Sequence, residues 1–369
     1  MRVRYSLIAR RVVKFDPVDK SLTHIGQDLG VGKGKWLKGD LANNGCIYCV
    51  PADRFAQILN VDTINGTTTV LDVQMPEPNK IERWFSGALA LDGCIYFMPY
   101  NARRILKLDP ENDSVCCVGD DYGGGQHKYA VTVADSNGFV YGIPYQSTRV
   151  IKFDPASSSS SIVVDEATSD LLCNSGCAFG RDGCIYSLRY VHYNTYEVLK
   201  IDVVNNTYSL IGNLGGIPDS DWGDAVLGND GCVYWPPLGA SRTLKFDPET
   251  QSISLVGDDF GGLKLKWPNG AVASDGAIYT YCLPVYMKYV LRIDPYLEFA
   301  TKMKADIKEH PEALGFLFER NNFGKTLYES AITKYGKAQV FQVIDDCIPN
   351  SIVWDGIETE AFMVIVALM

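Results

Sequence analysis

Residues that could carry acid–base or nucleophilic chemistry are sparse in this chain. Histidine occurs four times, at His24, His127, His192 and His310, and there is no HExxH, no GxSxG and no pair of CxxC motifs. Nucleophilic and metal-assisted catalysis need such groups to converge at one point. The sequence therefore favours a non-catalytic protein over an enzyme, and we predict no catalytic residue, no metal site and no cofactor.

Two pairs of neighbouring aspartates lie in glycine-rich segments, Asp120–Asp121 and Asp258–Asp259. Calcium prefers several oxygen ligands at one point, but no D-x-D-x-D-G spacing accompanies these pairs. The aspartates of the recurring Asp-Gly and Asp-Pro dipeptides are explained by turn formation. We expect the paired aspartates to form turns rather than a calcium site.

A basic residue recurs two positions before the aspartate of Asp-Pro or its equivalent, as in Lys107, Lys200 and Lys245. A ring of such side chains could bind an anion. The simpler interpretation is pairing with nearby aspartates across strands, where each exposed pair contributes little stability.

An aromatic residue recurs eight positions before the Asp or Asn of a recurring turn: Trp36, Trp84, Tyr129, Trp222 and Trp267. These rings could form a collar that stacks on a sugar or on a peptide side chain. The alternative is that they pack between neighbouring units, because repetition in nearly every unit is what packing requires. We include all five among the predicted ligand- or partner-binding residues.

The elements that position these residues come from a repeat. Phrases such as DGCIYFMPYNARRILKLDP and DGCVYWPPLGASRTLKFDP recur, and one tyrosine marks each copy, at Tyr5, Tyr48, Tyr96, Tyr141, Tyr186, Tyr234 and Tyr279. Each copy contains four short apolar runs separated by turn signals, which is typical of a four-stranded antiparallel propeller blade. We predict an all-β, seven-bladed β-propeller over residues 1–299. Its innermost strands carry small neutral residues apart from Lys38, Asp40 and Asp224.

The first copy lacks its innermost strand. The apolar tail at residues 351–369 contains AFMVIVALM, whose β-branched content suits a strand that would close the ring. A gene model truncated at its start is the competing explanation.

The repeated sequence motif resembles those of propellers of the YVTN, NHL and Kelch families. The [IV]Y strand, the polar loop and the [VI][LI]K[FIL]DP phrase match their layout over roughly residues 4 to 296. The paired glycines of a Kelch strand and the Trp-Asp signature of WD repeats are missing. The resemblance implies a fold and leaves the activity open, because these families include scaffolds, adaptors and a few enzymes.

Residues 300–350 lose the period of two and are predicted to form helices. The phrase NNFGKTLYESAITKYGKAQVFQVID resembles one ankyrin repeat, although Leu327 and Glu329 replace the usual proline and histidine. A single unit of this kind cannot bury its own apolar face. We therefore expect it to dock on the propeller, on a partner, or on further repeats that this chain lacks.

In a propeller, the loops between the second and third strands share one face with the loops that join successive blades. We call this the loop face, and the opposite one the turn face. The sequence of the loop face varies from copy to copy. We therefore predict that this face binds a partner, through Tyr100, Asn101, Arg103, Tyr145, His192 and Tyr286.

The preferred function is a non-catalytic protein-interaction scaffold. One alternative is a carbohydrate- or small-ligand-binding propeller that uses the aromatic collar. Another is a lactonase- or lyase-like enzyme that uses a loop-face histidine, His127 or His192, and a divalent cation.

Composition narrows the partners and the compartment. The formal net charge is −10, which argues against nucleic acid and anionic membranes as partners. The N-terminus has no apolar signal-peptide core and the longest apolar run is too short to span a membrane. The chain has 11 cysteines, and four fall at one equivalent repeat position, where neighbours are held too far apart to pair. We therefore expect buried thiols and a cytoplasmic protein.

Overall fold

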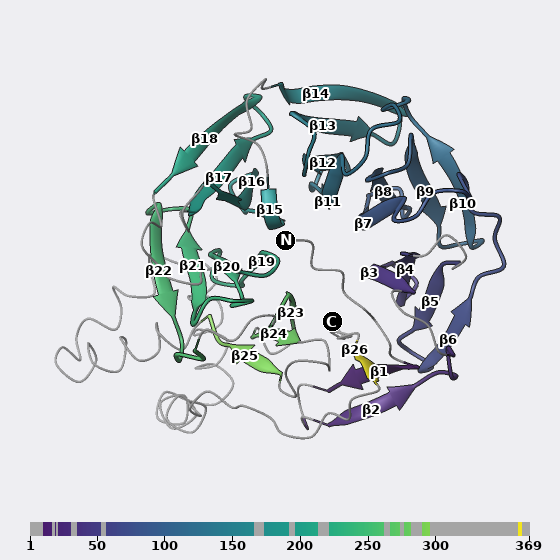
Figure 1. Cartoon of the computed structure of the whole chain (residues 1–369), viewed down its shortest axis with the longest axis horizontal. Helices are drawn as coiled ribbons and strands as arrows, with labels where there is room; N and C mark the ends of the chain where they lie inside the picture. The colour runs from purple at the N-terminus through teal and green to yellow at the C-terminus, as the bar shows by residue number, and fades with distance from the viewer. Residues whose placement is uncertain are drawn as a thin grey trace, which may run out of the picture.

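The computed structural model describes residues 10–16, 19, 21–30, 35–52, 57–165, 173–191, 196–212, 221–261, 266–273, 277–281, 290–295 and 361–363. These residues form β-sheets arranged in a ring around a central axis (Figure 1). The predicted ankyrin-like segment at 300–350, and with it His310, lies outside the described residues.

One blade shows how the repeat folds. Its strands β7 (Trp84–Leu89), β8 (Ile95–Pro99), β9 (Ile105–Asp109) and β10 (Ser114–Val118) pair antiparallel in sequence order. β7 lies nearest the axis and β10 lies outermost (Figure 1). The Asp-Gly turn after β7 holds Gly93 at a positive φ of 80°, a conformation that favours glycine, and its aspartate accepts the amide of Cys94.

Four more sheets repeat this four-stranded antiparallel pattern. They consist of β3 (Trp36–Leu41), β4 (Cys46–Pro51), β5 (Leu59–Asp62) and β6 (Thr67–Val70); β11 (Tyr129–Ala134), β12 (Val140–Pro144), β13 (Arg149–Asp154) and β14 (Ser159–Asp165); β15 (Cys173–Phe179), β16 (Cys184–Tyr190), β17 (Tyr196–Asp202) and β18 (Thr207–Ile211); and β19 (Val226–Leu227), β20 (Val233–Trp235), β21 (Thr243–Asp247) and β22 (Ser252–Val256). A sixth sheet has three described strands, β23 (Asn269–Val272), β24 (Ile278–Tyr281) and β25 (Leu291–Ile293). The prediction of an all-β propeller of four-stranded blades is thus confirmed.

The sheet of the first repeat departs from this pattern. β1 (Arg11–Phe15) pairs antiparallel with β2 (Leu22–Ile25), as the third and fourth strands of a blade would. On its other side β1 pairs in parallel with β26 (Ala361–Met363), from the apolar tail. The described residues therefore form six antiparallel blades and one irregular sheet, not seven equal blades. The tail lies next to the third strand, where a blade has its second strand, and not at the innermost position that we predicted.

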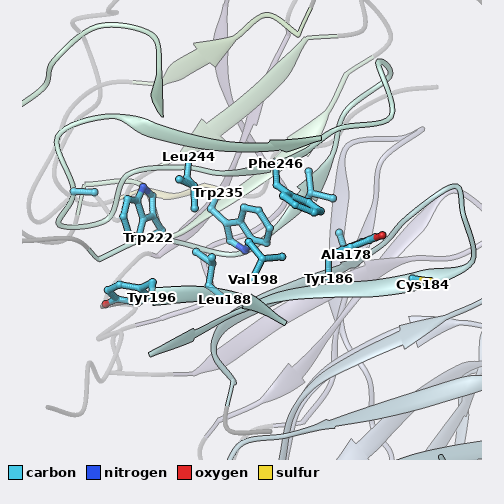
Figure 2. Packing of buried hydrophobic residues seen from close by; sticks show 12 residues of the cluster. Ala178, Cys184, Tyr186, Leu188, Tyr196, Val198, Trp222, Trp235, Leu244 and Phe246 are labelled. Atoms are coloured by element: carbon cyan, nitrogen blue, oxygen red, sulfur yellow. The ribbon is translucent and has the colours of Figure 1, made fainter. Parts of the chain in front are cut away.

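The core lies between neighbouring blades. Figure 2 shows one interface, in which Trp222, Trp235 and Phe246 of one blade face Tyr186 and Leu188 of the preceding blade. The rings of Tyr186 and Phe246 lie 5.2 Å apart between centroids. Contacts of this kind make each blade depend on its neighbours, as in other repeat folds.

Three of the marker tyrosines are core residues whose hydroxyls bond a turn aspartate. Tyr96, Tyr186 and Tyr234 are at most 2% exposed. Their hydroxyls donate to Asp92, Asp182 and Asp230 of the Asp-Gly turns at 2.6–2.7 Å.

The recurring lysines pair with the same turn aspartates. Lys107, Lys200 and Lys245 contact Asp92, Asp182 and Asp230 at 3.3–3.4 Å. The interpretation as cross-strand pairs thus describes these lysines. The cysteines that follow these turns, Cys94, Cys184 and Cys232, are buried free thiols.

Candidate functional site

The five aromatic residues of the predicted collar lie in the core. Trp36, Trp84, Tyr129, Trp222 and Trp267 are only 1–5% exposed. The indole N–H groups of Trp36, Trp84 and Trp222 donate to the carbonyls of Gln57, Arg104 and Arg242 at 2.7–3.0 Å. This is the packing role that the sequence analysis held as the alternative, and it leaves the rings no open face for a ligand.

A cation directly before four of these rings fastens the loop that joins two blades. Lys128 is buried and donates from Nζ to the carbonyls of Ala102 and Gly125, both at 2.7 Å. Burial lowers the pKa of Lys128 to about 8, since desolvation disfavours the ammonium form. Lys35 and Lys266 bond loop carbonyls in the same way, and Arg83 donates to Pro76 O at 2.9 Å. These cations hold the loop face in shape, a role that the sequence analysis missed although the Lys/Arg-aromatic dipeptide repeats.

On that scaffold, two neighbouring blades bring together four rings on the loop face. Tyr100 follows β8, Tyr145 follows β12, His127 precedes β11, and Phe85 lies in β7. The centroid of Tyr100 lies 5.0 Å from that of His127, 5.3 Å from that of Phe85 and 6.0 Å from that of Tyr145. We call these four residues the Tyr100 cluster.

Hydrogen bonds fix the backbone under the Tyr100 cluster. His127 has a positive φ of 57°, an uncommon conformation for a residue with a side chain. Its N–H donates to Asn101 Oδ1 at 2.9 Å, and its carbonyl accepts the amide of Gln146 at the same distance. Its Nδ1 lies 3.3 Å from Gln146 Oε1. Such a conformation persists only where the surroundings impose it, and it is found preferentially at functional sites.

The cluster presents a partly exposed edge. Tyr100 and His127 are 9% and 7% exposed, whereas Tyr145 is half-buried and Gln146 is exposed. Arg103, at the rim, pairs with Asp121 at 2.6 Å. A solvent-facing tyrosine ring backed by fixed rings is suited to receiving an apolar or aromatic side chain.

The structure brings together Tyr100, Asn101 and Tyr145 of the predicted binding residues, with Arg103 beside them. His192 and Tyr286 lie outside the described residues. Sequence reasoning did not select His127, Phe85 or Gln146 as binding residues, although His127 was recognised as able to reach the loop face. Phe85 and Gln146 could have been selected because they directly follow Trp84 and Tyr145, which were predicted to bind.

A second polar group lies at the central axis and combines residues from three blades. The ammonium of Lys38 on β3 forms an ion pair with the carboxylate of Asp224, which lies just before β19. β3 and β19 face each other across the centre of the ring (Figure 1). Asn269 on β23, with its amide nitrogen turned toward these acceptors, donates to Asp224 and, at 3.2 Å, to Pro268 O. Asp40 lies on β3 two residues after Lys38. We call Lys38, Asp40, Asp224 and Asn269 the axial group.

Irregular pairing aims Lys38 and Asp224. Between Trp36 and Gly39, β3 carries one more residue than β4, and the same bulge recurs in β7 between Trp84 and Gly87. A bulge bends the strand and redirects the side chains within it. Asp224 lies in the corresponding stretch between Trp222 and Val226, whose partners are Pro237 and Tyr234.

The two axial carboxylates pack against glycines of adjacent blades, in space that a side chain would fill. A Cβ atom at Gly176 would lie 2.4 Å from Asp224 Oδ1, and one at Gly87 would lie 2.6 Å from Asp40 Oδ2. Asp40 also accepts the amide of Gly87 at 3.1 Å. Desolvation raises the pKa of Asp40 to about 6, against the opposing effect of Lys38.

The paired aspartates behave as turn formers where they are described. Asp121 Oδ1 accepts the amide of Gly123 and Asp259 Oδ1 accepts that of Gly261, both at 2.8 Å. Over the described ranges, no group of three or more His, Cys, Asp or Glu side chains is placed to hold a metal ion. No helix within those ranges is long and apolar enough to cross a bilayer.

Taken together, the fold is that of an all-β propeller, and comparison with known proteins agrees at that level. No family model matches the chain, and no curated protein matches it. Among solved structures, a streptogramin B lyase is similar with a TM-score of 0.58 and 12% identity, over 76% of this chain and 92% of that one.

Two further solved structures are similar to the chain. A catalytically inactive virginiamycin B lyase from Staphylococcus aureus with quinupristin has a TM-score of 0.59 and 10% identity, over 76% and 94% of the two chains. Kuenenia stuttgartiensis hydrazine synthase has a TM-score of 0.53 and 12% identity, over 82% and 81%. At these identities the likeness extends to the fold alone.

Proposed function

We propose that this protein is a non-catalytic interaction module that binds a protein partner through the loop face. The observation that supports this most directly is the Tyr100 cluster, in which rings from two blades pack together, Tyr100 and His127 are buried, and Tyr145 stays partly exposed beside the exposed Gln146. Interfaces of proteins are centred on such buried aromatic anchors with a polar rim.

We expect the partner segment to match the chemistry of the cluster. An apolar or aromatic side chain would pack on Tyr145, and peptide groups beside it would bond the amide of Gln146. The backbone here is fixed before binding, which reduces the entropy cost of association. Arg103 and Asp121 neutralise each other at the rim, so we expect affinity to depend only weakly on salt.

We also propose that β1 and β2 are the third and fourth strands of a seventh blade, and that the tail closes the ring through β26. The lyase-like alternative has the fold of its structural neighbours in its favour and no residue geometry among the described residues. For that reason we do not advance it, nor the sugar-binding collar, whose rings are buried.

The test compares two surface charges. Tyr145→Glu places a carboxylate on the exposed edge of the Tyr100 cluster. Val204→Glu places one on the turn face, at a side chain that is 80% exposed. Proteins captured from native cell extract by the unaltered chain are identified, purified and titrated against both variants. We expect Tyr145→Glu to weaken binding about tenfold or more, as for the loss of a hot-spot residue, while Val204→Glu binds normally. Equal binding by both variants, or loss only with Val204→Glu, contradicts the proposal.

A further inference from the structure

The axial group differs from blade to blade, whereas the packing residues do not. Two positions after the collar aromatic, or after Asn174 in the blade that has no aromatic there, successive blades carry Lys38, Ser86, Val131, Gly176, Asp224 and Asn269. A role required by the fold would recur around the ring, as the tryptophans and the turn aspartates do. The charged residues at this position therefore need another explanation than blade packing.

Solvent reaches the ion pair at the axis. The side chains of Lys38 and Asp224 are 29% and 26% exposed. Ion pairs with this much access to water contribute little stability. A ligand that supplies a replacement charge to each partner can thus separate them at small cost.

The charges at the axis indicate which chemical class of ligand would fit there. Lys38 offers a cation with three N–H donors, and Asp224 offers an anion held by Asn269. Among the described residues, Asp40 is the other titratable group beside Lys38, and it is held by the amide of Gly87. A molecule that carries a carboxylate and an ammonium a few bonds apart satisfies both members of the pair at once. A simple carboxylate or a simple amine satisfies only one and leaves the other without its partner.

We propose that the axial group is a binding site for a small zwitterion of the α-amino acid class. The ligand carboxylate binds the ammonium of Lys38, and the ligand ammonium binds Asp224. This site is separate from the Tyr100 cluster and does not depend on the proposed protein partner.

The experiment titrates the full chain by calorimetry with glycine and L-alanine, and with acetate and ethylammonium as probes that carry one charge only. We expect the amino acids to bind at least about tenfold more tightly than either single-charge probe, which corresponds to one additional charge-assisted hydrogen bond. Absence of amino acid binding overturns the proposal. So does acetate or ethylammonium binding as tightly as glycine, which would indicate a simple anion or cation site.

Matched variants locate the site. Lys38→Met and Asp224→Asn should each abolish amino acid binding, and Lys38→Arg, which keeps the cation, should retain it. Lys200→Met removes a similar ion pair, with Asp182 on the turn face, and should bind as the unaltered chain does. If Lys38→Met unfolds at a lower temperature than the unaltered chain, amino acid binding by Lys38→Arg and Asp224→Asn still tests the site. Binding that survives Asp224→Asn, or is lost in Lys200→Met, refutes the assignment. Tyr145→Glu should leave amino acid binding intact, which separates this test from that of the proposed function.

Discussion

The carboxyl group of Asp40 provides a direct test of the electrostatics along the central axis. Its pKa is raised from 3.8 to about 6, chiefly because burial disfavours the charged form. Between these two pH values the folded state binds a proton that the unfolded state has released. The free energy of unfolding must therefore fall as the pH rises from about 4 to about 6, and stay lower above that window.

The size of this effect follows from the shift. A difference of 2.2 pH units, from 3.8 to about 6, corresponds to about 3 kcal/mol at most. Because Asp40 is only half-buried, water screens part of this energy, and we expect about 1–3 kcal/mol. Asp40→Asn is uncharged at every pH and can still accept the amide of Gly87. The variant should match the unaltered chain near pH 4 and exceed its stability by this amount above pH 7.

Chemical denaturation of both proteins from pH 4 to pH 8 measures the difference. Asp62→Asn is a control of opposite sign, because bonds from the backbone and side chain of Asn65 lower the pKa of Asp62 in the folded state. That variant should lose stability relative to the unaltered chain as the pH rises. If Asp40→Asn follows the unaltered chain at all pH values, or its advantage shrinks with increasing pH, burial does not raise the pKa of Asp40 in the folded protein.

Three further substitutions test the packing that supports the sites. Trp84→Ala should lower the free energy of unfolding in denaturant by about 3–5 kcal/mol, because removing a ring that is 1% exposed leaves a cavity. Trp84→Phe should recover part of this stability. A loss below about 1 kcal/mol in Trp84→Ala would contradict a core role for the ring. Tyr234→Phe removes the bond to Asp230 and should cost about 1 kcal/mol by the same assay, with no change expected if that bond is dispensable. Lys128→Met leaves the carbonyls of Ala102 and Gly125 without their donor, so limited proteolysis should cut residues 119–126 faster, whereas an unchanged cleavage rate would show that the lysine does not fasten this loop.

Much of the fold could be predicted because each blade repeats the same local signals. The Asp-Gly turns require a positive φ at the glycine, as at Gly93 and Gly231, and in the three such turns that the structure describes the following tyrosine bonds the turn aspartate. These features are local in sequence, so their spacing alone reveals four strands per copy. The first sheet could not be predicted in this way. The β-branched content of the tail marked it as a candidate strand, but its place beside β1 and its parallel direction join residues from opposite ends of the chain, and no local pattern encodes them.

The sites were harder to predict, for reasons that particular residues make clear. Trp84 and Tyr100 are both aromatic residues near the loop face, and nothing in their identity separates a ring in the core from a ring in a surface cluster. The difference arises from the strand register, which buries Trp84 opposite Pro99 at the start of β7. His127 required knowledge of a positive φ that its sequence neighbours do not announce.

Residues that recur from blade to blade and residues that differ between blades have different roles in this ring, and the comparison is the strongest indication of which residues bind a ligand. The collar aromatics repeat, and the structure buries them; the turn lysines repeat, and they pair with turn aspartates. Lys38 and Asp224 do not repeat, yet both lie in a stretch where the innermost strand has an extra residue that redirects side chains. A bulge shared by several blades supplies the geometry, and the residue placed in it differs from blade to blade. Repetition thus builds the frame, and the unequal residues at one common position are those free to specify a ligand.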